Sequence, residues 1–113
     1  MSTRSYVRDA VATRDRLLDD DSASALAETF RVLGDPTRVR ILDALLSRAE
    51  IPVCDLAGML GVTQSAVSHQ LRLLRSMRLV RARRDGRHIY YAVDDDHIVK
   101  LFKQGLEHVQ ERA

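Results

Sequence analysis

The sequence has 113 residues, a length that fits one domain and excludes a two-domain enzyme. Its 45% apolar and 30% charged residues are typical of a globular protein, and no apolar run approaches the roughly 20 residues of a membrane-spanning helix. Charges interrupt the first 21 residues throughout, so we expect neither a signal peptide nor an anchor, and a cytoplasmic protein. Cys54 is the single cysteine, which excludes an internal disulfide and a zinc ribbon.

The net charge of +2 hides a local excess of positive charge. Residues 63–90 carry seven arginines and one acid, whereas the parts before and after each carry a net charge of −2. A concentrated basic stretch favours a polyanionic partner such as nucleic acid, because a solvated helix usually mixes its signs. The alternative is a basic surface with no binding role.

Apolar spacing predicts three helices in the first part of the chain. The first two cover residues 6–18 and 24–33. Asp35 is the expected N-cap of the third, and Pro36 occupies its first position, where a missing N–H is harmless. This helix runs to about Leu46. Its predicted inward-facing residues are Val39, Leu42, Leu45 and Leu46.

The next two predicted helices form a helix-turn-helix pattern. Pro52 opens a short helix that Gly61 ends. After Val62, Thr63 is the expected N-cap of a longer helix whose apolar residues recur every three or four positions as far as Met77. A short helix, a tight turn with glycine and a helix with a polar first turn are typical of DNA-binding proteins. Two packed helices without a DNA role are the alternative.

A basic β-hairpin is predicted after these helices. Runs of strand-forming residues at 79–84 and 87–93 flank Asp85 and Gly86. An Asp-Gly pair predicts a two-residue type I′ turn, whose central positions both need a positive φ. We interpret this hairpin as a wing. Its arginines are Arg81, Arg83, Arg84 and Arg87. The alternative is that these arginines have no DNA role and only keep an edge strand soluble.

A last helix is predicted from Asp95 or Asp96 to about Gln110, with one apolar side. The fold class expected from these elements is mainly α with a small β-hairpin, a winged helix-turn-helix that is homodimeric through its terminal helices. A dimer is expected because one such module makes too few base contacts for useful specificity. We expect an N-terminal helix or arm at 1–22. Residues 23–113 would form the winged domain, with a C-terminal helix for dimerisation and metal binding.

Candidate DNA-reading residues lie at the start of the second helix of the pattern and on the wing. Residues near the start of such a helix face base edges and phosphates. The amide of Gln64 suits adenine, and Arg72 and Arg75 suit phosphates. The full set of candidates is Gln64, Ser65, Ser68, His69, Arg72, Arg84 and Arg87.

The last predicted helix carries candidate metal ligands. His97 and His108 are eleven residues apart, which places them on nearly the same face but about 16 Å apart along the axis. One helix therefore cannot bring both to one metal, whereas two copies crossing antiparallel can. Asp95 can join His97 from the N-cap, and Glu111 follows His108 by three residues. Two imidazoles and two carboxylates suit tetrahedral Zn²⁺, with Co²⁺ as a substitute. Histidines that only cap or solvate the helix are the alternative.

Several motifs together resemble those of the ArsR/SmtB family of metal-responsive winged-helix repressors. They are DLA at 55–57, GVTQSAVSHQLRLLR at 61–75, DGRHIYY at 85–91, DxH at 95–97 and HxxE at 108–111. The resemblance covers about residues 23–112 and implies a homodimer on double-stranded operator DNA with an inverted repeat. The last-helix pattern is similar to that of the zinc-sensing branch. It implies that Asp95 and His97 of one protomer and His108 and Glu111 of the other bind Zn²⁺, which releases the DNA. It also implies a signal from His108 to the backbone near Arg78.

The sequence departs from many relatives at the start of the fourth helix, where they carry two nearby cysteines. Only Cys54 stands there, so we expect no thiolate-rich metal site and interpret Cys54 as a small buried residue. A DNA-binding regulator that senses no metal, or another signal, is the main rival hypothesis. A zinc hydrolase is disfavoured, because all four expected ligands of the metal are protein groups and leave no open position. We therefore expect no enzyme.

Overall fold

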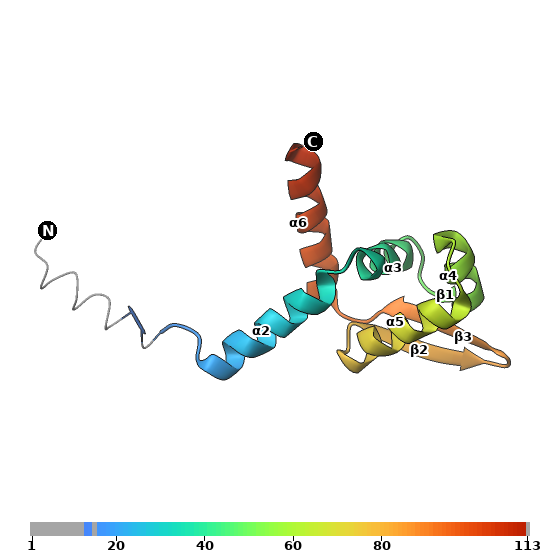
Figure 1. Cartoon of the computed structure of the whole chain (residues 1–113), viewed down its shortest axis with the longest axis horizontal. Helices are drawn as coiled ribbons and strands as arrows, with labels where there is room; N and C mark the ends of the chain where they lie inside the picture. The colour runs from blue at the N-terminus through green and yellow to red at the C-terminus, as the bar shows by residue number, and fades with distance from the viewer. Residues whose placement is uncertain (1–12, 15, 113) are drawn as a thin grey trace, which may run out of the picture. The chain divides into compact units, whose positions relative to one another are not determined.

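The computed structural model describes residues 13–14 and 16–112, and Figure 1 shows its helices and strands. The elements are α2 (Asp20–Leu33), α3 (Pro36–Leu46), β1 (Ile51–Pro52), α4 (Val53–Leu60), α5 (Gln64–Ser76), β2 (Val80–Asp85), β3 (His88–Val93) and α6 (Asp96–Arg112). The fold is therefore mainly helical with a small antiparallel sheet, as the sequence predicts. No helix in the described part of the chain is long and apolar enough to cross a membrane.

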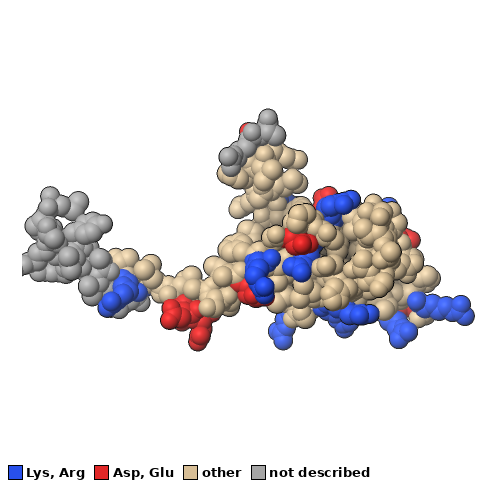
Figure 2. Space-filling view, viewed as in Figure 1, with Lys and Arg blue, Asp and Glu red and all other residues tan. Residues whose placement is uncertain are grey.

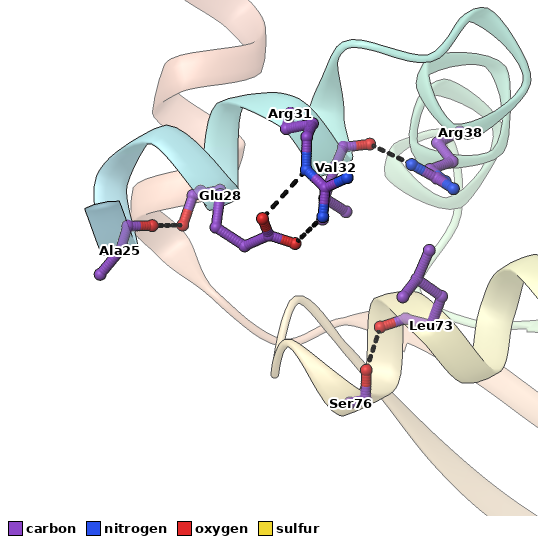
Figure 3. Close-up of polar contacts among 8 residues, drawn as sticks. Ala25, Glu28, Arg31, Val32, Arg38, Leu73 and Ser76 are labelled. Atoms are coloured by element: carbon purple, nitrogen blue, oxygen red, sulfur yellow. Dashed lines mark hydrogen bonds and ion pairs between the residues drawn. The ribbon is translucent and has the colours of Figure 1, made fainter. Parts of the chain in front are cut away.

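The chain divides into two compact units, residues 1–31 and residues 32–113. In the first unit, most of the predicted helix at 6–18 lies outside the described residues, and its end at 16–18 is a turn and not a helix. α2 begins at Asp20, earlier than predicted, because Asp19 caps it. The Asp19 carboxylate accepts the N–H of Ser22 at 2.7 Å, and this bond lowers the pKa of Asp19. Further along α2, Glu28 and Arg31 form a two-bond ion pair (Figure 3).

The core of the second unit comes from nearly every element after α2. Its most buried side chains are Ile41, Leu42, Leu45, Ile51, Leu56, Val67, Leu71 and Leu74. The prediction of an inward Val39 is wrong, since this side chain is 40% exposed while Ile41 is fully buried. In α6, only Ile98 is buried, with Phe102 packed against the core, and every described side chain from Lys103 to Glu111 is exposed.

The two helices of the predicted helix-turn-helix are α4 and α5. Gly61 ends α4 with a positive φ of 68°, a conformation that glycine adopts without steric cost. Thr63 caps α5, and its side-chain oxygen accepts the N–H of Ala66 at 3.1 Å. Both residues therefore have the predicted roles. α4 begins at Val53, one residue later than predicted, because Pro52 belongs to β1.

A double hydrogen-bonded turn connects α5 to β2. Arg78 has a φ of +60°, and its N–H donates to the carbonyl of Arg75. The N–H of Leu79 donates to the carbonyl of Leu74, and both leucines are buried. These bonds form the turn that commonly ends helices, here with an arginine in the position that glycine usually holds.

The wing is a three-stranded antiparallel sheet with the order β1-β3-β2. The sequence predicts the hairpin of β2 and β3 but misses β1, which pairs Ile51 and Pro52 with β3. Asp85 pairs with His88, so the turn residues are Gly86 and Arg87 and not Asp85 and Gly86. Only Gly86 of these two has a positive φ, which contradicts the predicted type I′ turn.

Candidate nucleic-acid interface and metal ligands

The candidate DNA-reading residues of α5 share the side of this helix that faces away from the core. Val67, Leu71 and Leu74 attach α5 to the rest of the domain. Ser68 is half-buried, and the other candidates are exposed. The exposed ones are Gln64, Ser65, His69 and Arg72, together with Arg75 one turn further on. The helix therefore offers amide, hydroxyl, imidazole and guanidinium groups to a partner.

A cleft of about 190 Å³ joins the start of α5 to the wing. Gln64 and Ser68 line it from α5, and Arg87 lines it from the turn of the hairpin. The fold thus brings Arg87 of the wing to two predicted residues of α5 that lie far from it in the sequence. The other lining residues are Val53, Cys54, His88 and Ile89.

Cys54 and His88 have positions that sequence patterns did not reveal. Cys54 is half-buried and lines the cleft, so the expectation of a buried core residue is wrong. Its thiol lies 3.7 Å from the carboxylate of Asp55. His88 opens β3 and lines the same cleft. A winged fold places both residues near the predicted DNA-reading residues, and this expected placement is the signal that could have found them.

The arginines of the wing fall into two groups. Arg81 pairs with Asp94 at 3.4 Å, and Arg83 pairs with Glu50 through two hydrogen bonds. Arg84 and Arg87 make no ion pair with any residue that the structure describes. Figure 2 shows blue side chains projecting from the edge of the domain where Figure 1 places α5 and the hairpin. The two unpaired arginines are those predicted from the sequence to bind DNA.

Asp95 and His97 lie together at the start of α6, as the sequence predicts. Asp95 directly precedes the helix, and its backbone carbonyl accepts the N–H groups of Ile98 and Val99. Its Oδ1 accepts the backbone N–H of His97 at 2.8 Å and lies 3.1 Å from Nδ1 of the His97 ring. The His97 side chain is 94% exposed, so this pair is open to a ligand from another molecule.

His108 and Glu111 lie near the other end of α6. Both are exposed, and their spacing of three residues places them on neighbouring positions of the helix surface. Within the described part of one chain, no three His, Cys, Asp or Glu side chains come close enough to hold a metal ion. One protomer therefore carries two separate pairs of candidate ligands, whose donor types suit Zn²⁺.

Comparison with known proteins agrees with this architecture. The transcriptional repressor SmtB homolog of Synechocystis sp. is 50% identical over 91 residues, which cover 80% of this chain and 68% of that protein. Residues 35–82 also match the model of the family described as bacterial regulatory protein, arsR family. This chain belongs to the arsR family.

Solved structures of other proteins support the same fold. The AntR antimony-specific transcriptional repressor has a TM-score of 0.79 and 34% identity, covering 85% of this chain and 86% of that one. A homodimeric winged helix-turn-helix DNA-binding domain from Mycobacterium bovis has a TM-score of 0.73 and 29% identity, covering 84% and 89%. The predicted winged helix-turn-helix fold is confirmed. These relatives are regulators, and the metal named for one of them is not zinc.

Proposed function

We propose that this arsR family protein is a transcriptional repressor that binds an inverted repeat in double-stranded DNA as a homodimer and is released by Zn²⁺. The observation that carries the DNA-binding part is the cleft in which Gln64 and Ser68 of α5 meet the unpaired Arg87 of the wing. A reading helix and a basic wing side by side fit a groove and the phosphates beside it. Residues 23–113 form the functional domain in this proposal.

The homodimer is supported by an apolar face that α6 leaves uncovered in one chain. Leu106 is 43% exposed and Val109 is 64% exposed. They follow the buried Ile98 along α6 at helical spacing. Gly105, which directly precedes Leu106, has no side chain that would keep another helix away. A second copy of α6 would cover this face, and the structural relative from M. bovis is itself described as homodimeric.

The metal-binding part rests on the two pairs of candidate ligands, one at the start of α6 and one near its end. Asp95 and His97 of one protomer would bind Zn²⁺ with His108 and Glu111 of the other, and the two-fold axis would repeat the site. Co²⁺ would substitute, because it accepts the same nitrogen and oxygen ligands. The ion would fix the angle between the two α6 helices and misplace the paired α5 helices relative to DNA half-sites one turn apart. Zinc and DNA would then weaken each other's binding by the same factor.

The test is a fluorescence anisotropy titration with an inverted-repeat duplex selected in vitro by the apo protein. Zn²⁺ is expected to weaken binding of the wild type by about 5- to 150-fold, and His108→Ala and His97→Ala should each abolish this response. Lys103→Ala is the matched control, since Lys103 is exposed on the same helix but is not a proposed ligand. Equal DNA affinity with and without Zn²⁺ contradicts metal sensing by this site.

A constitutive DNA-binding regulator, or one with another effector, is the rival outcome. It is favoured if the wild type binds the duplex and both histidine variants respond to Zn²⁺ as the wild type does. Because one structural relative is described as antimony-specific, an antimony salt belongs in the same titration. No binding to any selected duplex would contradict the repressor function itself.

A further inference from the structure

We propose that Arg83 is a positioning residue, which ties the wing to strand β1 and thereby aims Arg84 and Arg87 at DNA without binding DNA itself. This inference rests on the proposed DNA-binding function. It divides the wing arginines by role, where the sequence shows only a run of like charges.

Arg83 reaches across the whole width of the sheet. In the register of the strands, Arg83 of β2 faces Tyr90 of β3, which faces Pro52 of β1. The Arg83 guanidinium lies over the Tyr90 ring, with Cζ 4.7 Å from the ring centroid. Beyond the ring it donates from Nε and Nη2 to the carboxylate of Glu50, at 3.2 and 2.5 Å. Because Glu50 directly precedes β1, one side chain connects both edges of the sheet.

The backbone alone attaches β1 weakly. The strand has two residues, and Pro52 has no N–H to donate to the ladder. A two-stranded hairpin is only marginally stable without a third strand or a packed face. The stacked, two-bond contact from Arg83 to Glu50 adds a charge-assisted link at this weak edge. We call the contact of Arg83, Tyr90 and Glu50 the wing staple.

Charge and strand geometry separate Arg83 from the arginines available to DNA. Two acids neutralise Arg83, because Asp85 lies 3.7 Å from Nη1 in addition to Glu50. Successive residues of a strand point to opposite faces, so Arg84 projects away from the face that carries the staple. Arg84 and Arg87 have no acidic partner among the described residues.

The decisive variant is Glu50→Gln, because electrostatics and the staple predict opposite signs. Removing an acid from a basic surface should tighten DNA binding if charge alone matters. Loss of the staple should instead weaken binding to the selected duplex by about two- to fivefold. Arg83→Lys keeps the charge but loses the planar two-bond contact, so it should weaken binding to the same extent. The double variant should be no weaker than either single one, as for two groups that act as a unit.

Salt dependence distinguishes positioning from direct contact. Arg84→Ala, the matched control, should lower the slope of log affinity against log salt by about one, as expected for a lost phosphate contact. Glu50→Gln should weaken binding without lowering this slope, because it leaves all cationic groups in place. Equal or tighter binding by Glu50→Gln, or additive effects of the two staple variants, would overturn the proposal.

A readout without DNA keeps the staple testable if the repressor function fails. In the nuclear magnetic resonance spectrum, Glu50→Gln and Arg83→Lys should both shift the Tyr90 ring signals. Asp94→Asn, which breaks the ion pair of Arg81 near the start of the hairpin, should not. Unshifted Tyr90 signals in both staple variants overturn the proposal whatever the DNA result. Circular dichroism of each variant verifies that the helices are intact.

Discussion

Arg38 donates a hydrogen bond from Nη1 to the carbonyl oxygen of Val32 at 3.2 Å (Figure 3). In a continuing helix the partner of this carbonyl would be the N–H of residue 36, but residue 36 is a proline and has none. The half-buried Arg38 supplies the missing donor. Its Nε also donates to the side-chain oxygen of Gln70 in α5, at 2.9 Å. One guanidinium thus satisfies two acceptors that the local chain cannot.

Replacing Arg38 should therefore destabilise the domain. Arg38→Ala leaves the Val32 carbonyl and the Gln70 amide oxygen without this donor, and we expect the free energy of unfolding to fall by about 1–3 kcal/mol in urea titrations. Arg40→Ala is the matched control on the exposed side of α3, with an expected change within about 0.5 kcal/mol. Equal effects of the two substitutions would show that Arg38 has no special structural role.

The turn after α5 predicts a stabilising substitution. Arg78 holds a positive φ that costs a residue with a side chain about 1–2 kcal/mol, so Arg78→Gly should raise the thermal midpoint. Gly61→Ala is the reciprocal experiment at a φ of 68°, where an added methyl group meets no atom within 4 Å. Any loss of stability in this variant therefore comes from the strained backbone conformation of alanine, and we expect about 1 kcal/mol of destabilisation. A lower midpoint for Arg78→Gly would contradict this account of the turn.

Acid should remove the contribution of the wing staple. The hydrogen bonds from Arg83, with the nearby charges of Arg83 and Arg81, lower the pKa of Glu50 below its ordinary value near 4.3. A lowered pKa in the folded state stabilises the protein above the ordinary value, and this gain disappears as the pH falls through the lowered pKa. Wild type should therefore unfold at a higher temperature than Glu50→Gln at pH 7, and the two should converge near pH 3. A constant difference across this range would rule out ionised Glu50 as the cause.

The uncovered face of α6 predicts which substitution separates the protomers. Leu106→Glu places a charge on the apolar face and should shift the protein from dimer to monomer in sedimentation velocity runs, with a parallel loss of DNA affinity. Lys103→Glu changes the charge by more at an exposed site off this face, and it should leave the dimer intact. A dimeric Leu106→Glu protein would place the interface elsewhere.

Zinc affinity should depend on protons. Imidazole must be neutral to bind a metal, so protons compete with the ion and zinc affinity should fall as the pH is lowered. Competition with a chelator of known affinity, at pH values from 5.5 to 7.5, measures the change. Affinity that stays constant over this range would argue against His97 and His108 as ligands.

Sequence patterns predicted the parts of the fold in which side-chain spacing and backbone chemistry agree. Thr63 and Gly61 have strong local preferences, so the start of α5 and the end of α4 followed directly. Spacing misled at Val39, because α3 packs against α4 and β3 with Ile41 buried and leaves Val39 exposed. β1 was missed since two residues show no period, and the hairpin turn moved by one position because pairing extends to Asp85 and His88.

The candidate sites were predictable to different degrees. The Asp95 and His97 pair followed from N-cap chemistry within a few residues of chain. The role of Arg83 did not, because its partner Glu50 lies 33 residues earlier and only folding brings them together. Charge counting treats Arg83 and Arg84 alike, whereas their contacts separate them. The proposed metal site involves two chains, so the sequence of one gives only its halves.

The turn at Arg78 and Leu79 also limits how a signal can travel. Its two backbone hydrogen bonds and the buried Leu74 and Leu79 join the end of α5 directly to β2, so we expect α5 and the wing to tilt together. In the proposed dimer, an event at the C-terminal end of α6 would then change DNA affinity by reorienting one whole domain against its partner.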